Sequence, residues 1–562
     1  MDLVLDIETD SKQTKIWMCY THNSDTNEFI CHTEASTLIP LLNKADRLIG
    51  HNLIGYDAPV LNKLWGTKIG LKKVRDTLIM SRLLNPSIEN GHSLAAWGQR
   101  LGNEKIEYKV LWHQLKGLPY DKLSVAPYDD PIDDLNRTYC QQDVAVTVEL
   151  YNMLTGQLKD WGDSVQLEHD VAAILKRQEA HGFKFDSHKG QALLSLLTGQ
   201  IADIEGELQT TFPPIVEERI SEKTGKALKA RVTAFNPGSR QQIADRLATL
   251  GVKFEQKTEK GSIIINEKVL EGIEVPEAKL IARYLMLQKR ISQVNGWFDV
   301  VKPDGRVYGR VITNGAVTGR MTHIKPNMAQ VPNSGSEYGS ECRELWVVEE
   351  GKKLVGIDAS GLELRMLAHY MQDKGYINEL LNGDIHSANQ KAAGILTRSV
   401  AKTFIYAFLY GAGAAKIGSI VGGSREDGNK LMKRFLRNTP ALARLKEKVQ
   451  EHSTKGWILG LDGRQLLIRS EHSALNTLLQ GAGAILMKKA LVIFNNKLKC
   501  GIIDAKFCAN VHDEWQVEVL EEDAERVGKM GVAAIEEAGV ALKLRCPTTG
   551  EYHVGNNWKE TH

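Results

Sequence analysis

The sequence predicts a protein of several domains that begins with an α/β domain and continues through helical segments into an α+β region. Its 562 residues exceed the roughly 250 to 300 residues at which one hydrophobic core stops growing. Strands followed by helices run to about residue 155, and helical periodicity dominates from about 160 to 210. A buried-strand pattern and an alternating hairpin pattern return after residue 350.

Composition is that of a soluble globular protein, with 42% hydrophobic and 25% charged residues. The chain has an acidic residue at position 2 and then an apolar run of only three, which is no signal peptide, and we find no uncharged stretch long enough to span a bilayer. The seven cysteines are scattered without a C-x-x-C pair. We therefore expect no disulfide framework, no zinc knuckle, no membrane partner and a reducing, cytoplasmic location.

Positive charge is concentrated in one segment although the whole chain carries only +2. Residues 391–470 hold 15 Lys and Arg against 5 Asp and Glu, whereas residues 1–150 sum to −4. A localised basic segment is what neutralisation of phosphates requires. A solvated helical face would explain the same charges, so charge alone does not decide between the two.

The α/β domain carries four acidic residues in a suggestive order. Asp6 and Glu8 lie two apart on a strand predicted over residues 2–7 and so point to one face. Asp57 follows the apolar run 48–50, and Asp143 comes four residues after Tyr139 on one helix face. A D-x-E pair alone is typical of a solvated strand end, but four carboxylates with a phenol indicate paired magnesium or manganese ions acting on a phosphodiester.

The middle of the chain is predicted to be helical, with one interruption. Apolar residues recur at helical spacing from 160 to 210, and the pattern then breaks at Pro213-Pro214 and a charged loop over residues 217–229. The sequence FNPGSR at 235–240 indicates a turn that leads into a helix, and helices continue to about residue 291.

A second acidic position follows a buried strand. The run 354–357 ends at Asp358 and passes through a short turn into a segment that contains Glu363. Asp358 has a simpler interpretation as the N-cap of the following helix.

One helix combines cations and phenols on a single face. The sixteen residues between Gly394 and Gly411 lack Gly and Pro, which predicts a helix of about 24 Å. Its positions 398, 402, 406 and 410 are Arg, Lys, Tyr and Tyr. Such spacing is also typical of a core-facing stripe, but cations with aromatics suit phosphates and a base to stack on.

A hairpin completes the second acidic set. Residues 515–519 alternate between apolar and polar after the stretch 509–514, which predicts a hairpin with His512 and Asp513 near its tip and with an exposed acidic pair formed by Asp513 and Glu514. Hairpin tips are often acidic for solubility, so this signal is weak by itself.

Many ordered motifs are shared with one known family. In chain order they are DIETD, HNLIGYD, Asp76-Thr77 with SRLL after it, YCQQD, FNPGSRQQI, YLMLQKRI, NGAVTGRMTH, PNMAQVP, GIDASGLELRMLAHY, GDIHSANQ, RSVAKTFIYAFLYGAGAAKIG, GLDGR, ALNTLLQGAGA, NVHDEWQVEV and GNNW. The chain thereby resembles the DNA polymerase I family, family A, and most closely its replicative members from short-tailed bacteriophages. The resemblance runs nearly from end to end.

The resemblance implies a fold and a division into domains. It implies an α/β exonuclease domain of the RNase H-like kind over residues 1–155, followed by an α+β right-hand polymerase domain. In that domain, thumb and linking helices would occupy 156–300, the palm 301–385 and 456–562, and the fingers 386–455. It implies template-directed DNA synthesis with 3′→5′ proofreading, used to replicate phage DNA.

Site roles follow from the same resemblance. Asp358 and Asp513, with the backbone at Ala359, would hold two Mg²⁺ ions, for which Mn²⁺ could substitute. Asp6, Glu8, Asp57 and Asp143 would hold two more, with Tyr139 orienting a water, and because all are present we expect an active exonuclease. The residues implied to contact the incoming dNTP are Arg398, Lys402, His386, Tyr406, Tyr410 and the steric gate Glu363. Those implied to contact primer-template DNA are Thr318, Arg320, Asn476, Gln480, Arg464 and His512.

Two departures from the family pattern concern partners. The chain begins at the exonuclease without a 5′-nuclease, which favours a replicative role, with a helicase and primase as expected partners. Some phage relatives carry a long thumb insertion that captures thioredoxin, but the space between Phe212 and Phe235 is short here. Thioredoxin dependence is therefore doubtful.

Three other functions fit parts of the sequence less well than a polymerase does. They are a nuclease with a decayed polymerase half, an accessory protein that only grips primer-template, and a single-subunit RNA polymerase. Retention of Asp358, Lys402 and Asp513 disfavours the first, and intact carboxylates at both sites disfavour the second. Glu363 and the proofreading domain disfavour the third.

Overall fold

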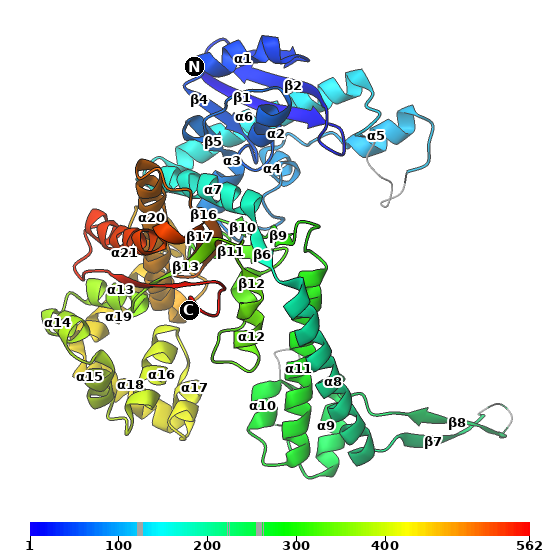
Figure 1. Ribbon diagram of the computed structural model, residues 1–562, viewed down its shortest axis with the longest axis vertical. Helices are drawn as coiled ribbons and strands as arrows, with labels where there is room; N and C mark the ends of the chain where they lie inside the picture. The colour runs from blue at the N-terminus through cyan, green and yellow to red at the C-terminus, as the bar shows by residue number, and fades with distance from the viewer. Residues whose placement is uncertain (121–127, 222, 224, 255–260, 262) are drawn as a thin grey trace.

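The computed structural model describes residues 1–120, 128–221, 223, 225–254, 261 and 263–562 (Figure 1). The amino-terminal domain lies at one end of the molecule, and the carboxyl-terminal half is built around a second sheet. Two helical groups extend from that second sheet on opposite sides, α14–α18 and α8–α11.

The amino-terminal domain is built on a five-stranded mixed sheet of order β3-β2-β1-β4-β5. Its strands are β1 (Asp2–Thr9), β2 (Ile16–Asn23), β3 (Glu28–His32), β4 (Arg47–Gly50) and β5 (Val74–Asp76). β1 pairs antiparallel with β2 and parallel with β4. Alternate β1 residues enter separate cores, Leu3 and Leu5 on one face and Val4 on the other. Burial on both faces fits the alternation of strands and helices that predicted an α/β domain.

Helices cover this sheet and lead out of the domain. They are α1 (Ala35–Lys44), α2 (Asp57–Leu64), α3 (Thr77–Leu84), α4 (Leu94–Leu101), α5 (Tyr108–Leu115) and α6 (Asp133–Leu158). α6 packs against β1 and β2, which brings its carboxylate and phenol to the strand that bears Asp6. α7 (Ser164–His181) then contacts α20 (Ala474–Cys500) and β16 (Lys506–Val511) of the second half.

A helical arm follows the short strand β6 (Phe183–Phe185). It comprises α8 (Ser187–Thr211), α9 (Arg240–Thr249), α10 (Glu267–Glu271) and α11 (Pro276–Phe298). The charged stretch predicted as a loop instead forms a hairpin of β7 (Ile215–Ile220) and β8 (Ala227–Thr233), which projects from the arm (Figure 1). The prediction of a loop relied on the many charged residues of this stretch. The stretch also contains β-branched residues that form cross-strand pairs, such as Val216 with Val232, and these favour a hairpin.

The second half is centred on an antiparallel sheet of order β16-β17-β13-β18. With β16, its strands are β13 (Lys352–Ala359), β17 (Glu514–Leu520) and β18 (Gly550–Gly555). The helices α13 (Leu362–Met371), α20 and α21 (Ala524–Ala541) pack together beside it. Smaller pairings involve β9 (Arg306–Val307), β10 (Arg310–Ile312), β11 (Thr322–Ile324), β12 (Trp346–Val347), β14 (Trp457–Leu459) and β15 (Gln465–Leu467), and α12 (Gly339–Glu344) precedes β12.

The remaining helices form the group that carries the basic segment. They are α14 (Lys374–Asn382), α15 (Ile385–Ala393), α16 (Arg398–Leu409), α17 (Ala414–Ile420), α18 (Arg425–Asn438) and α19 (Pro440–Ser453). α16 begins three residues later than predicted because Gly394 ends α15 in a left-handed conformation and the Thr397 side chain caps α16.

α20 is the central core helix of the second half. Among the described residues it is the one helix long and apolar enough to cross a membrane, and 72% of its apolar window is buried inside the protein. Its apolar character is therefore explained by core packing. The seven cysteines are free.

Candidate active sites

The first acidic set comes together on one face of the amino-terminal sheet. Asp6 and Glu8 project from β1 beside Cys140 of α6, and the three potential ligand atoms lie within 4.8 Å of one another. Asp57 begins α2, is 3% exposed, and accepts a hydrogen bond from the Ile7 amide at 3.2 Å.

Burial and mutual repulsion strongly perturb these carboxyl groups. Burial, with Asp143 next in effect, raises the pKa of Glu8 to about 8, and burial raises the pKa of Asp57 to about 7. The pKa of Asp6 is raised by burial and then by Asp57, Asp143 and Glu8. Such shifts show that the site lacks sufficient positive charge for its carboxylates.

Asp143 and Tyr139 complete this set from one face of α6, as their spacing predicted. Oδ1 of Asp143 is buried and has no hydrogen-bond partner among the described residues. An orphaned carboxylate oxygen among other carboxylates fits a hard divalent cation such as Mg²⁺ or Mn²⁺. Oδ2 of Asp143 and the phenol of Tyr139 both contact the ammonium of Lys105.

Lys105 is the site residue that the sequence did not reveal. It lies in an irregular segment before α5, 38 positions from Asp143, and belongs to none of the motifs noted above. Neither periodicity nor local spacing could have indicated that it reaches the carboxylates.

The second acidic set forms where β13 ends beside the β16–β17 hairpin. Asp358 stands opposite Glu514 in the sheet register, and the Ala359 amide donates to the Asp513 carbonyl at 3.1 Å. Asp358 is no helix cap, because Gly361 occupies the N-cap of α13. Burial and the neighbouring Asp513 raise the pKa of Asp358 to about 8, and burial and Glu363 raise that of Asp513 to about 6.

The hairpin differs from the prediction in one respect. Its tip carries His512 at a φ of 56° and Asp513, as expected, but Glu514 is buried instead of exposed. The Trp558 indole donates to Glu514, and His562 pairs with it at 3.1 Å. Of the acidic pair, only Asp513 is therefore available to a ligand.

Glu363 is held beside the carboxylates by two donors. The Tyr410 hydroxyl donates to it at 2.9 Å, and Arg320 approaches the same oxygen at 3.5 Å. Arg320, His512 and Asp513 also line one small pocket. Residues from α13, from the end of α16 and from two separate loops therefore lie near one another here.

The cationic face of α16 is exposed, as a ligand-binding face must be. The helix buries Ala401, Phe404 and Ile405, whereas Arg398 and Lys402 face outward. The stripe of cations and phenols is therefore not the core face. Arg398 pairs with Asp384 at 2.6 Å, and the ring centroid of Tyr406 lies 6.2 Å from that of His386 and 6.4 Å from that of Tyr410.

The residues predicted to contact DNA take different positions. Asn476 and Gln480 lie one turn apart on α20 and are joined by a 2.7 Å hydrogen bond. Thr318 is 9% exposed in the loop that also carries Arg320. Arg464 is only 1% exposed, and Glu168 and Asp462 engage its guanidinium at 2.6 and 2.7 Å. In this structure Arg464 faces the core, contrary to the expected DNA contact.

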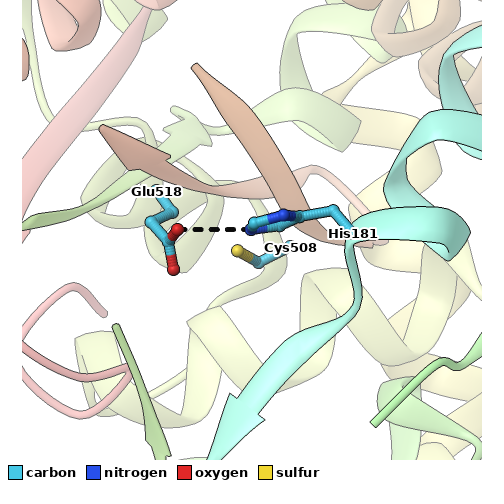
Figure 2. Close-up of side chains that lie close together, drawn as sticks. All are labelled: His181, Cys508 and Glu518. Atoms are coloured by element: carbon cyan, nitrogen blue, oxygen red, sulfur yellow. Dashed lines mark ion pairs between the residues drawn. The ribbon is translucent and has the colours of Figure 1, made fainter. Parts of the chain in front are cut away.

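A further group of possible metal ligands lies elsewhere, formed by His181, Cys508 and Glu518 (Figure 2). His181 at the end of α7 faces Glu518 of β17 at 3.3 Å. Glu518 also pairs with Arg306 at 3.1 Å and Lys352 at 2.8 Å. Because two cations already balance this carboxylate, the group fits an ion-pair network that fastens α7 to the hairpin strand.

Comparisons with known proteins agree with this geometry. The model of DNA polymerase family A matches residues 210–560. The chain is 35% identical to the DNA-directed DNA polymerases of Enterobacteria phage T3 and of Escherichia phage T7, over 92% of this chain and 92% of each relative. It is 25% identical to DNA polymerase I of Pseudomonas aeruginosa over 93% of this chain and 58% of that protein.

A solved structure shows the same fold. It is described as the POL domain of Pol1 from M. smegmatis in complex with DNA primer-template and dNTP, and its TM-score is 0.79 at 19% identity. The alignment covers 99% of this chain and 95% of that one, which supports the right-hand polymerase fold predicted for the second half. Taken with the match to the family model and the identity to the phage enzymes, this establishes that the chain belongs to DNA polymerase family A.

Proposed function

We propose that this chain is a DNA-directed DNA polymerase that extends a primer with deoxynucleotides, and that its amino-terminal domain removes nucleotides from the same 3′ end. The observation that carries the proposal is the presence of two separate carboxylate clusters on two sheets, each with pKa values raised by burial. Among the described residues, no cation pairs with Asp358 or Asp513. Such clusters are suited to divalent cations.

In the polymerase site, Asp358 and Asp513 with the backbone of Ala359 would hold two ions. When bound, Mg²⁺ or Mn²⁺ would activate the primer 3′-hydroxyl and neutralise charge on the departing pyrophosphate. Lys402 has no carboxylate partner among the described residues and is exposed, so its ammonium is free to bind a triphosphate. Arg398 and His386 would add to this contact, and Tyr410 offers a ring for stacking near the templating base.

Primer-template DNA would lie against the palm, including its helix α20. Thr318, Arg320, Asn476, Gln480 and His512 offer donors for the minor groove, where acceptors are common to all base pairs. Because such contacts are independent of sequence, they can check pairing geometry at every template position.

In the exonuclease site, Asp6, Glu8, Asp57 and Asp143 would hold two ions around the terminal phosphodiester. Water would add to phosphorus and the bond to the 3′ oxygen would break, which releases one nucleotide and leaves a new 3′-hydroxyl. The Tyr139 phenol would orient that water. The biological setting that we propose is replication of phage DNA in the cytoplasm of an infected bacterium, with a helicase and primase as partners, since the relatives from phages T3 and T7 are 35% identical to this chain over 92% of its residues.

The test measures primer extension and primer shortening on one labelled primer-template with Mg²⁺. Asp358→Asn should abolish extension and leave shortening, whereas Asp6→Ala/Glu8→Ala should do the reverse. Asp299→Asn repeats the first change at an exposed carboxylate of the helical arm and should affect neither activity. Wild type that shortens the primer but never extends it at any dNTP concentration would refute the polymerase. Extension without any shortening would refute the exonuclease alone.

A further inference from the structure

Lys105 places a buried ammonium inside the exonuclease site. Its side chain is 15% exposed, and Nζ donates to the Tyr139 hydroxyl at 2.9 Å. The same ammonium contacts Oδ2 of Asp143 and lies 4.5 Å from the centroid of the Tyr139 ring. Although burial lowers the pKa of Lys105, the charges of Asp143 and Tyr139 outweigh it, and the pKa stays above its usual value.

The backbone that carries Lys105 is fastened to α6. The Ile106 amide donates to Gln142 Oε1 at 2.8 Å, and the Gln142 amide group donates back to the Glu104 carbonyl. The Asn103 side chain adds a 3.0 Å bond to Glu149 of the same helix. Because these bonds flank Lys105 on both sides, the ammonium is held at a fixed point relative to Tyr139 and Asp143.

This contact determines what the phenol can do. The Tyr139 oxygen accepts a hydrogen bond from Lys105, so the phenol's own hydrogen is directed away from the ammonium. The Tyr139 hydroxyl can therefore donate its hydrogen bond only on the side away from Lys105. Asp143, with Oδ2 held by Lys105, keeps Oδ1 free.

We propose that Lys105 is a positioning residue for exonuclease hydrolysis, acting through Tyr139 and Asp143. The inference rests on the exonuclease function proposed above. Lys105 fixes the direction of the phenol O–H toward the attacking water and holds Oδ2 of Asp143.

The test separates positioning from loss of structure with two readouts. Hydrolysis of a 5′-labelled single strand is followed at saturating DNA, and Mn²⁺ binding is followed by electron paramagnetic resonance in an Asp358→Asn/Asp513→Asn background. Lys105→Met should lower the maximal hydrolysis rate roughly 10- to 100-fold, as expected when a group that orients a ligand is lost. It should also bind Mn²⁺ more tightly, since a competing positive charge has gone.

Three further variants sharpen the result. Lys105→Arg retains a charged donor and should recover part of the rate. Lys109→Met makes the same change at an exposed lysine in the first turn of α5 and should match the parent. In a Tyr139→Phe background, Lys105→Met should lower the maximal hydrolysis rate by a smaller factor than it does in the parent, because part of its effect passes through the phenol.

The outcomes that overturn the inference are distinct from those that overturn the exonuclease itself. A Lys105→Met rate within twofold of the parent would show that Lys105 positions nothing. A lower rate with weaker Mn²⁺ binding would show that the lysine merely holds the site together. If the parent extends primers but hydrolyses no strand, the exonuclease proposal fails first, and the role of Lys105 fails with it.

Discussion

Glu363 illustrates how much of the nucleotide site depends on single side chains. Its carboxylate accepts from the Tyr410 hydroxyl and pairs with Arg320, which fixes it near Asp358 and Asp513. If Glu363 crowds the ribose 2′ position, Glu363→Ala should raise ribonucleotide insertion relative to deoxynucleotide insertion by roughly 10- to 100-fold. Single-nucleotide insertion with matched rNTP and dNTP measures the ratio. Tyr410→Phe removes only the supporting donor and should change the ratio less, and an unchanged ratio in Glu363→Ala would exclude the steric gate.

Tyr406 offers a second prediction at the same scale. Its phenol is half-buried between His386 and Tyr410, and it could replace the missing 3′-hydroxyl of a dideoxynucleotide. We therefore expect ready incorporation of dideoxynucleotides. Tyr406→Phe should increase discrimination against them by about 10- to 100-fold, the worth of one hydrogen bond to a charged group. Chain-termination assays with mixed ddNTP and dNTP give the ratio, and equal use by both proteins would contradict the prediction.

Residues differ in how far the sequence alone could place them. The spacing of Asp6 and Glu8 on a strand, and of Tyr139 and Asp143 on a helix, is enough to put each pair on one face. Lys105 and Arg464 could not be placed in this way, because each takes its site position from a partner distant in the chain. Arg464 meets Glu168 across 296 residues, which no local pattern records.

At the scale of elements, a buried ion-pair network joins α7 to α20 and the loop before β15. Glu168 on α7 accepts from Arg464 and from Lys488 on α20, both at 2.6 Å, and all three side chains are 1% exposed or less. Burial would raise the pKa of Glu168, but Lys488 and Arg464 lower it to about 2. Its stabilisation is therefore complete above the ordinary glutamate pKa and is lost as pH falls toward 2.

Removing the charge of Glu168 should leave the buried Lys488 without a carboxylate partner and the buried Arg464 with Asp462 alone. Glu168→Gln is expected to destabilise the protein by about 3–5 kcal/mol. Calorimetry at pH 7 measures the change, with Glu207→Gln at an exposed position of α8 as the matched control. If Glu168→Gln unfolded within about 2 °C of wild type, the network would contribute little to the joint between the two halves.

The β7–β8 hairpin is the opposite kind of element. Every residue of β7 is exposed, including the apolar Val216 and Ile220, and an isolated two-stranded hairpin is marginally stable in water. Since it buries almost nothing, replacing residues 215–233 with a Gly-Ser linker should leave the Tm within about 2 °C and the rate of nucleotide insertion unchanged. A fall of more than about 5 °C would show that the hairpin supports the helical arm.

At the scale of the whole molecule, local periodicity predicted the layers better than the chain's long-range connections. The α/β domain follows from strands alternating with helices, the strand before Asp358 from a continuous apolar run, and the hairpin of His512 from apolar alternation. The start of α16 was displaced by a cap, and the charged loop proved to be a hairpin, because capping and cross-strand pairing outweigh composition locally. The connection that α7 makes between the two halves through Glu168 could be recognised only from the three-dimensional structure.

The two carboxylate clusters also give the molecule a stability that depends on metal and pH together. Glu8 and Asp358, with pKa values near 8, and Asp57, near 7, bind protons more readily folded than unfolded. Their ionisation therefore lowers the free energy of unfolding as pH rises from about 4 toward 8. Buried histidines act in the opposite sense, since the pKa of His51 is lowered by burial to about 3 and that of His169 to about 4. The free energy of unfolding measured against pH in the absence of metal would therefore contain the opposing contributions of the carboxyl groups and of the histidines.

The difference in Tm between the protein with metal and the protein without metal reports on the carboxylates alone. The histidines titrate identically in both samples, so their contribution cancels. At pH 8 a divalent ion would offset the repulsion among ionised groups, so Mn²⁺ should raise the Tm by several degrees. At pH 5 these carboxyls are protonated when folded, the ion must compete with protons, and the increment should nearly vanish. Asp358→Asn and Asp6→Ala/Glu8→Ala should each remove part of the pH 8 increment, and together most of it. An increment equal at both pH values would show that the ions bind elsewhere than at these carboxylates.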